Sequence, residues 1–192
     1  MARPVQQRSI QTRDRLLQVA GAMALDQGLA GLRTEAIVER AGVAKGTFFA
    51  HFPDKDHLVA ELVARRMAGL IPTDAPNVAG FLAGLEPLFA LMTAEAEVLD
   101  ILARFAGPAG QAAGLDVVIC DLIAAQAGQL GALQGLGLVR PSPDPATLAE
   151  GVFAFLLHAA ASAQCPISAP DRLARQQAAR DLLARLVSAW IT

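Results

Sequence analysis

Apolar residues recur at intervals of three and four along most of this sequence, which is the spacing of one face of an α-helix. The first stripe includes Leu16, Ala20 and Met23. It predicts a helix that begins after the N-cap residue Thr12 and ends at Gly28, because glycine readily adopts the left-handed conformation that ends helices. Residues 1–11 carry two arginines, a proline and several glutamines, and we expect them to form a mobile basic arm.

The most informative stretch is residues 33–52, whose pattern predicts two short helices joined by a tight turn. Gly42 supplies the bent backbone that ends the first of these helices. The positions expected to face inward are Ile37, Val38, Ala41, Val43, Phe48 and Phe52. The positions expected to face outward on the second helix are Lys45, Thr47, Ala50 and His51. This is the pattern of a helix-turn-helix, in which the second helix enters the DNA groove.

The second half of the chain also predicts helices, separated by proline- and glycine-rich breaks. Residues 69–77 contain two prolines and an aspartate and mark a domain boundary. The next predicted helix, 78–92, contains Pro87, whose ring should kink it or split it in two. Asp144 and Pro145 form the strongest helix start of this half, an N-cap residue followed by proline at the first helical position. Further stripes predict helices that begin near residues 93, 112 and 171.

Composition favours an all-α protein, and the pattern along the chain predicts about nine helices. Hydrophobic residues make up 54% of the 192 residues, alanine and leucine are abundant, and tyrosine is absent. Charge is uneven, because residues 1–67 hold 10 Lys and Arg against 7 Asp and Glu, a net +3. Residues 68–192 hold 6 against 11, a net −5. Both lysines of the chain, Lys45 and Lys55, lie in the positive part, which suits a nucleic-acid partner.

The cysteines, the first residues and the longest uncharged stretch indicate the cellular compartment. Cys120 and Cys165 are too few and too far apart for a disulfide framework or a metal-binding pair, which fits a reduced cytoplasm. No basic and then apolar signal segment opens the sequence. The longest stretch without a charged residue, 151–170, is interrupted by a histidine, a glutamine and two prolines. We therefore expect a buried helix there and no membrane partner.

The order of residues from about 12 to 67 resembles the DNA-binding domain of TetR/AcrR-family transcriptional regulators. The matching features are Gly28 after the first helix, Ile37 before the Ala-Gly-Val turn, the KGTFF run at 45–49, the HF pair at 51–52 and the DK step at 54–55. The resemblance implies a three-helix TetR-type helix-turn-helix domain at 9–68, followed by an effector-binding and dimerisation domain at 75–192. It implies contacts to a double-stranded DNA operator from Arg33, Thr34, Lys45, Gly46, Thr47, His51 and Lys55.

The resemblance also implies a homodimer, in which the last two helices of each subunit form a four-helix bundle. The apolar residues that we expect in this interface are Val152, Phe155, Leu186 and Trp190. Three residues depart from the family's usual pattern. Phe49 stands where a tyrosine commonly reaches a phosphate, Ala50 replaces a position that is often large and polar, and Arg33 occupies the usual place of a Ser or Thr cap.

The expected function is a repressor that leaves its operator when a small apolar or aromatic effector binds the second domain. Residues between Leu122 and Val139 are uncharged and poor in polar groups, which favours an apolar effector. The lining of its pocket stays unknown, since ordinary core is the favoured interpretation of each candidate; the candidates are Phe89, Met92, Phe105, Cys120, Gln126 and His158. The alternative is a ligand-blind or partner-regulated helical DNA-binding protein.

An enzyme is the least favoured class. The three histidines lack the paired spacing of metal ligands, and the sequence has no dinucleotide fingerprint and no phosphate-binding loop. Cys120 could meet His158 in space, yet a free cysteine in this setting is expected to be a small buried hydrophobe. We therefore expect no catalytic residue, no metal and no cofactor.

Overall fold

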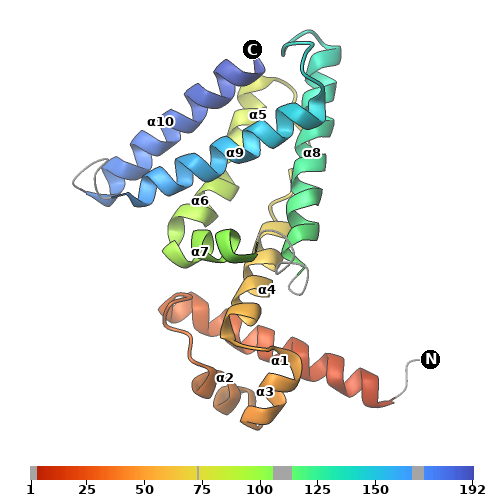
Figure 1. The fold of residues 1–192 in the computed structure, drawn as a ribbon, viewed down its shortest axis with the longest axis vertical. Helices are drawn as coiled ribbons and strands as arrows, with labels where there is room; N and C mark the ends of the chain where they lie inside the picture. Colours follow the sequence, from red (N-terminus) through yellow and green to blue (C-terminus); the bar gives the residue numbers. More distant parts are fainter. Residues whose placement is uncertain (1–3, 73, 106–113, 166–170) are drawn as a thin grey trace.

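A computed structural model describes residues 4–72, 74–105, 114–165 and 171–192. In these residues the chain forms ten α-helices and no strand, so the all-α prediction is confirmed. Figure 1 shows an N-terminal part, α1–α4, at one end and a C-terminal part, α5–α10, at the other, with α4 leading from one to the other. The helices are α1 Pro4–Gln27, α2 Thr34–Ala41, α3 Lys45–His51, α4 Lys55–Ala68, α5 Val78–Gly84, α6 Glu86–Ala94, α7 Ala96–Phe105, α8 Leu115–Gly135, α9 Pro145–Gln164 and α10 Arg172–Ile191.

The first helix is longer than its apolar stripe predicts. It begins at Pro4, so the expected arm is wrong for residues 4–11, while residues 1–3 of that arm lie outside the described residues. Thr12 does not cap a helix, because its hydroxyl donates to the Arg8 carbonyl one turn earlier, at 2.9 Å. Proline is well tolerated in a first turn, and glutamine and arginine form helix readily without an apolar face.

The helix-turn-helix prediction is confirmed in its local geometry. Gly42 adopts φ 64° at the end of α2, and its N–H donates to the Glu39 carbonyl. Phe48 of α3 and Phe52, which follows it, are 0% and 1% exposed, so both rings lie in the core, as expected. Asp54 caps α4 by accepting a hydrogen bond from the His57 N–H at 2.9 Å.

Partial burial alone would raise the pKa of Asp54. The hydrogen bonds from the His57 side chain and N–H outweigh this effect, so the pKa lies below its ordinary value. The carboxylate therefore stays charged at the positive end of α4, where a negative charge is favoured.

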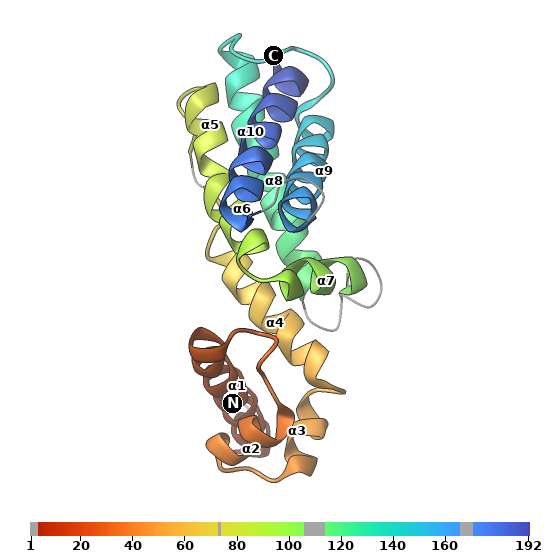
Figure 2. The same ribbon diagram turned by 90° about the vertical axis from the view of Figure 1, so that its left-hand side faces the viewer.

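The C-terminal part is organised by breaks in its first helices. Pro87 splits the predicted helix 78–92 into α5 and α6, as expected, which raises the number of helices in the described chain from about nine to ten. The expected start near residue 93 is wrong, because Thr93 belongs to α6 and its hydroxyl donates to the Phe89 carbonyl at 2.9 Å. Glu95 alone separates α6 from α7, and the path bends there by 98°. Figure 2 shows α7 lying across the lower end of the α5, α6, α8, α9 and α10 bundle.

The last two helices lie side by side, as Figures 1 and 2 both show. Asp144 caps α9 by accepting hydrogen bonds from two backbone N–H groups of its first turn, and Asp171 caps α10 by accepting one from the Ala174 N–H. Trp190 of α10 covers Gly151 of α9, where a side chain would collide with the indole, and its Nε1 donates to the Leu148 carbonyl at 3.1 Å. This close fit joins α9 and α10 within one chain.

Two helices, α8 and α9, are long and apolar enough to cross a membrane by length and composition alone, and the bent run from α5 to α7 would add a third candidate. In the fold α8 packs against α4 and α9, and α9 packs against α10. Only 28% of the most apolar window of α8, and 44% of that of α9, is buried within the described chain. Both helices therefore keep apolar surface that a single copy leaves uncovered.

Candidate nucleic-acid interface

The residues expected to contact DNA occupy three helix starts and one helix end. Arg33 and Thr34 lie at the start of α2, and Lys45, Gly46 and Thr47 form the first turn of α3. His51 is the last residue of α3 and Lys55 the first of α4. Arg33, Lys45 and Gly46 are exposed, and Thr34, Thr47, His51 and Lys55 are half-buried. Each of the seven residues expected to contact DNA is thus at least partly exposed in the single chain.

One ion pair brings the starts of α2 and α3 together. Lys45 Nζ lies 2.5 Å from Glu35 Oε1, and both side chains are more than half exposed. The hydrogen bond from Lys45 lowers the pKa of the Glu35 carboxyl. In the described residues, no hydrogen bond or ion pair links His51 to this pair. Glu35 was not among the predicted site residues, because its partner is ten residues away across the turn.

The start of α2 is open. Arg33 holds the N-cap position in an extended conformation, and its side chain makes no capping hydrogen bond. The unpaired N–H groups of such a turn favour anions, and the helix dipole adds to the attraction. The carboxylate of Glu35 in that turn opposes this attraction. A phosphate near α2 would therefore meet Arg33 and the backbone, with Glu35 competing for Lys45.

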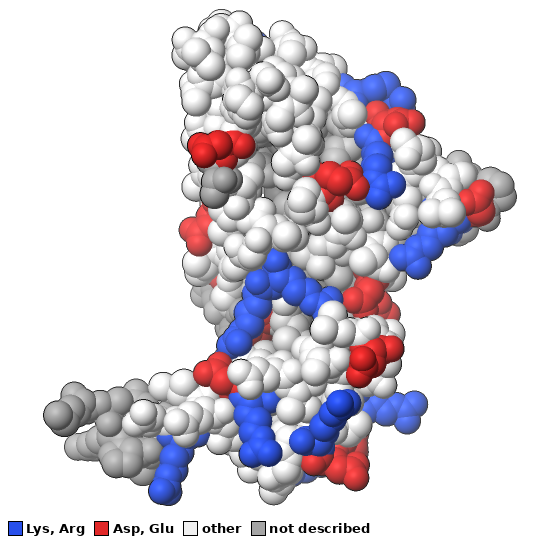
Figure 3. Space-filling view, turned by 180° about the vertical axis from the view of Figure 1, so that it is seen from behind, with Lys and Arg blue, Asp and Glu red and all other residues white. Residues whose placement is uncertain are grey.

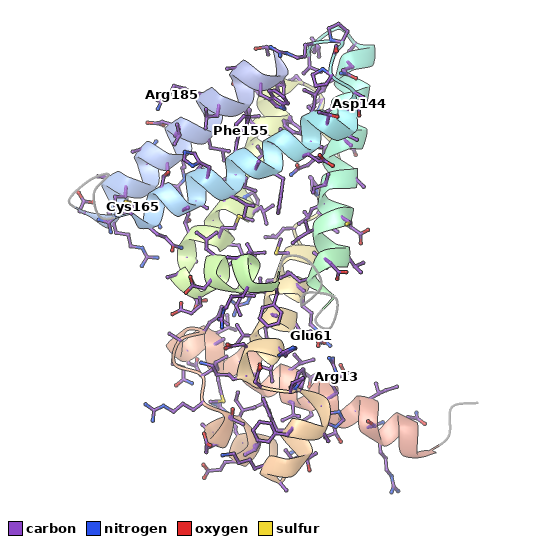
Figure 4. The ribbon with its side chains drawn as sticks, viewed as in Figure 1. Arg13, Glu61, Asp144, Phe155, Cys165 and Arg185 are labelled. Atoms are coloured by element: carbon purple, nitrogen blue, oxygen red, sulfur yellow. The ribbon has the colours of Figure 1, made fainter. Side chains whose placement is uncertain are left out.

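The buried phenylalanines in and after α3 determine which side of this helix faces outward. Phe48 contacts Phe49 edge-to-face, with ring centroids 5.4 Å apart, and Phe52 at 5.6 Å. Arg13 of α1 lies over the Phe52 ring at 4.7 Å and pairs with Glu61 of α4 at 2.5 Å, as Figure 4 shows for Arg13 and Glu61. Arg13 thus links α1 to α4 and to Phe52, the residue that follows α3. Arg13 was not predicted from the sequence, because its partner is 48 residues away.

Glu61 and Arg65, four residues apart on α4, pair at 3.1 Å, and Asp14 of α1 also contacts Arg65 at 3.1 Å. Partial burial alone would lower the pKa of Arg65, but Asp14 and Glu61 together raise it above its ordinary value. Two arginines thus share Glu61, which is 9% exposed, so this acid is compensated on both sides.

Charge is distributed as the sequence predicts. Figure 3 shows Lys and Arg side chains spaced around the N-terminal part, whereas much of the C-terminal part in the same view carries no charge. Arginines also lie at the junction of the two parts, where Arg66 and Arg104 each pair with an acid across it. Basic side chains around α1–α4 suit a phosphate backbone, whose attraction is independent of sequence.

The C-terminal part contains an apolar cavity of about 300 Å³ between α7, α8 and α9. Its lining is Leu99, Leu102, Ala103, Ile119, Phe153, Leu157 and Ala161. None of the pocket candidates from the sequence lines it. Cys120 and His158 are both exposed, so the expectation that Cys120 is a buried hydrophobe is wrong. Ile119, the residue before Cys120, lines the cavity instead.

Helix α7 contacts the N-terminal part at both of its ends. At the first end, Glu95 accepts a hydrogen bond from the Leu29 N–H in the turn between α1 and α2, and it pairs with Arg66 at 3.2 Å. At the other end, Arg104 pairs with Asp56 at 2.5 Å. Phe105 lies edge-on to the His57 ring, with centroids 5.0 Å apart. The helix that lines the cavity thus also meets α4 and the turn that follows α1.

Comparison with known proteins agrees with this geometry. The model of the family described as bacterial regulatory proteins, tetR family, matches residues 16–62. None of the curated proteins compared matches the sequence.

In the described residues, no group of three His, Cys, Asp or Glu side chains is placed to hold a metal ion.

Several solved structures share the fold over nearly the whole chain. A protein from Mesorhizobium loti described as a TetR-family transcriptional regulator is 22% identical, with a TM-score of 0.59 over 95% of this chain and 96% of its own. SmeT, the repressor of the Stenotrophomonas maltophilia multidrug efflux pump SmeDEF, is 20% identical, with a TM-score of 0.56 over 94% and 90%. FadR from Bacillus subtilis, solved in complex with stearoyl-CoA, is 15% identical, with a TM-score of 0.58 over 88% and 96%. At these identities the likeness concerns the fold.

Proposed function

Residues 16–62 make this chain a member of the TetR family, and from that premise we propose that it is a cytoplasmic, homodimeric repressor released from its operator by an apolar ligand. The observation that carries the proposal is the first turn of α3, which stands exposed beside the open start of α2. Both helix starts rest on a buried core that includes Phe48. An exposed basic turn on a rigid support is what a recognition helix requires.

We assign roles to the DNA-contacting residues by their chemistry. Lys45, Lys55 and Arg33 supply charge for phosphates, and Thr47 and His51 supply polar groups for base edges. A side chain at Gly46 would meet no atom within 4 Å, so this position faces open space and lets the backbone approach the duplex. On binding, Lys45 exchanges Glu35 for a phosphate. The exchange costs little, because exposed ion pairs are weak.

Two observations support a homodimer: helix-turn-helix proteins bind paired DNA half-sites, and apolar side chains of α9 and α10 are only partly covered in the single chain. Helix-turn-helix dimers read two half-sites about 34 Å apart, one DNA turn. We place the interface on the outer side of α9 and α10, where Phe155, Leu186 and Trp190 are only half-buried in the single chain. The expectation that Val152 lies in this interface is wrong, because it is 0% exposed and belongs to the core of a single chain.

The ligand is proposed from the cavity of about 300 Å³, whose lining residues are all apolar. A charged ligand would lose its hydration there without gaining a partner, so a hydrocarbon or aromatic molecule fits best. FadR from Bacillus subtilis, which shares the fold, was solved with stearoyl-CoA, a ligand with a long apolar chain. Since α7 lines the cavity and contacts the N-terminal part at both ends, a ligand that displaces α7 would move the two recognition helices off their spacing.

A band-shift titration with DNA adjacent to the protein's own gene tests the DNA-binding claim. Lys45→Ala should weaken binding and flatten the plot of log affinity against log salt by about one unit, because one phosphate contact is lost. Arg140→Gln is the matched control, since it removes one positive charge close to the C-terminus, where the Arg140 N–H donates to the Ile191 carbonyl. An equal slope for wild type, Lys45→Ala and Arg140→Gln would show that α3 does not contact phosphates.

A thermal-shift panel of apolar ligands distinguishes a ligand-responsive repressor from the ligand-blind alternative, because a ligand that binds the native state raises the melting temperature.

A further inference from the structure

Phe49 is an aromatic side chain that the fold leaves largely open to solvent. All eight phenylalanines lie in the described residues; six are buried, Phe155 is half-buried, and Phe49 alone is exposed, at 48%. It belongs to α3, which lies toward the end of the molecule away from the C-terminal part (Figure 1). Phe49 is not one of the seven residues expected to contact DNA. The helix assigned to the DNA groove thus carries an exposed ring without an assigned role.

The side of α3 around Phe49 carries only one other long side chain. Lys45 and Phe49 are four residues apart and share one face of the helix, and Gly46 and Ala50 form the neighbouring row. All four residues are exposed. A side chain built at Gly46 would meet no atom within 4 Å. Because Gly46 and Ala50 are small, the Phe49 ring is the largest apolar group that a duplex would meet on this side of α3.

The Phe49 ring is positioned by the core before any partner binds. It packs edge-to-face on Phe48, which is 0% exposed, with ring centroids 5.4 Å apart and ring planes at 82°. Phe48 in turn lies 5.6 Å from the ring of Phe52, which is 1% exposed. A phenylalanine side chain has only two torsions, so little conformational entropy is lost when it is fixed. Phe49 therefore offers a preorganised apolar contact.

The major groove of DNA presents one apolar group, the C5 methyl of thymine. The other base edges in that groove present hydrogen-bond donors and acceptors, and the side chains of Phe49 and Ala50 can neither donate nor accept. A ring placed over a polar edge would remove its water without supplying a new hydrogen bond, which is unfavourable. A ring placed over a methyl group removes apolar surface of both partners from water, which is favourable. This side of α3 therefore favours thymine over the other three bases.

We propose that Phe49 is a specificity-determining residue, which contacts the methyl group of a thymine in each half-site of the operator. This inference rests on the proposed function, since it requires α3 to enter the major groove. Lys45 lies one turn earlier on the same face, so the phosphate contact assigned to it positions the ring over the base pairs. Phe49 adds an apolar contact to the polar groups that Thr47 and His51 supply for base edges.

Duplexes selected from a random-sequence pool by the wild-type protein provide the probes. The selected sequences should share a thymine at one position of each half-site. Each shared thymine is then replaced by deoxyuridine, which pairs in the same way and lacks only the methyl group. From the usual contribution of one buried methyl group, the sensitive replacement should weaken binding about fourfold in one half-site and about fifteenfold in both.

Variants at position 49 test whether this ring contacts the methyl group. Phe49→Ala should bind the thymine and deoxyuridine duplexes equally in fluorescence anisotropy, and the four affinities form a double-mutant cycle between the ring and the methyl. Phe49→Gln keeps a long side chain without the ring and should show the same loss of preference. Leu25→Ala is the matched control, because Leu25 is an exposed apolar side chain of α1, at 82%, and lies outside α3. It should keep the wild-type preference for thymine.

The first result that would overturn the proposal is equal binding of thymine and deoxyuridine duplexes by the wild type, a comparison that needs no variant. The second is an equal loss on deoxyuridine replacement in wild type, Phe49→Ala and Phe49→Gln, because another residue would then contact the methyl. The third is a set of selected sequences without a shared thymine. In all three cases the protein still binds specific DNA, so the proposed function stands. Failure to select any duplex would instead overturn the proposed function, and this inference with it.

Discussion

Replacing Glu95 by alanine should loosen the connection between the C-terminal part and the DNA-reading part while leaving the DNA-contacting surface intact. Glu95 is the single residue between α6 and α7, and it contacts Leu29 and Arg66 of the N-terminal part. It lies on none of the surfaces assigned to DNA. The change therefore separates coupling from DNA contact.

The expected magnitude follows from the groups that lose a partner. The Glu95 and Arg66 side chains are 22% and 28% exposed, so their pair is only partly screened by water. Hydrogen bonds to charged groups are worth about 1.5–3 kcal/mol, and the N–H of Leu29, which is 1% exposed, would lose its acceptor. We expect Glu95→Ala to lower the free energy of unfolding by about 2–4 kcal/mol. Glu95→Gln keeps an acceptor for Leu29 and should cost about 1 kcal/mol.

The assay is urea unfolding followed by circular dichroism, together with operator affinity measured with and without an apolar ligand that raises the melting temperature. Both Glu95 variants should reduce the factor by which the ligand weakens operator binding. Glu97→Ala is the matched control, since it removes the same charge two residues later, where no hydrogen bond or ion pair forms in the described residues. If Glu95→Ala and Glu97→Ala lower stability equally, and the ligand acts on both as on wild type, the Glu95 contact does not couple the two parts.

Three further outcomes follow from the contacts. Glu35→Gln should strengthen DNA binding, because it removes a carboxylate near the phosphate path and frees Lys45; unchanged or weaker binding in a band shift would contradict this. Asp54→Ala should lower the free energy of unfolding by about 1 kcal/mol near neutral pH, through loss of the α4 cap. Since the pKa of Asp54 is lowered in the fold, that contribution is present above about pH 4 and is lost as the pH falls through the lowered value, so wild type and variant should converge in acid; a constant difference would refute the role of the charged cap. Leu186→Glu should yield monomers in sedimentation, because a symmetric interface would receive the charge twice, and a dimer would place the interface elsewhere.

The sequence predicted the helix-turn-helix well because its signals are local. Gly42 and the inward phenylalanines act within a few residues of their place in the chain, so spacing alone locates them. The start of α1 was missed for a related reason. Residues 4–11 are mostly polar, and a helix without an apolar stripe gives no periodic signal, even where its residues favour helix.

Contacts between distant segments could not be predicted in the same way. Apolar spacing shows that Val152 is buried, but not whether its partner is the same chain or a second copy. The contacts of Glu95 with Leu29 and of Arg13 with Glu61 span 66 and 48 residues. They depend on the 98° turn before α7 and on the path of α4, which the sequence pattern does not specify.

Reciprocal calorimetry tests the central claim, that ligand and operator oppose each other. An apolar ligand that stabilises the protein is titrated into the protein alone and into the protein saturated with operator DNA. We expect operator to weaken ligand binding by the same factor by which ligand weakens operator binding, because coupling between two binding sites is symmetric. Equal ligand affinities in the two titrations would contradict this coupling and would show that the ligand occupies the cavity without releasing DNA.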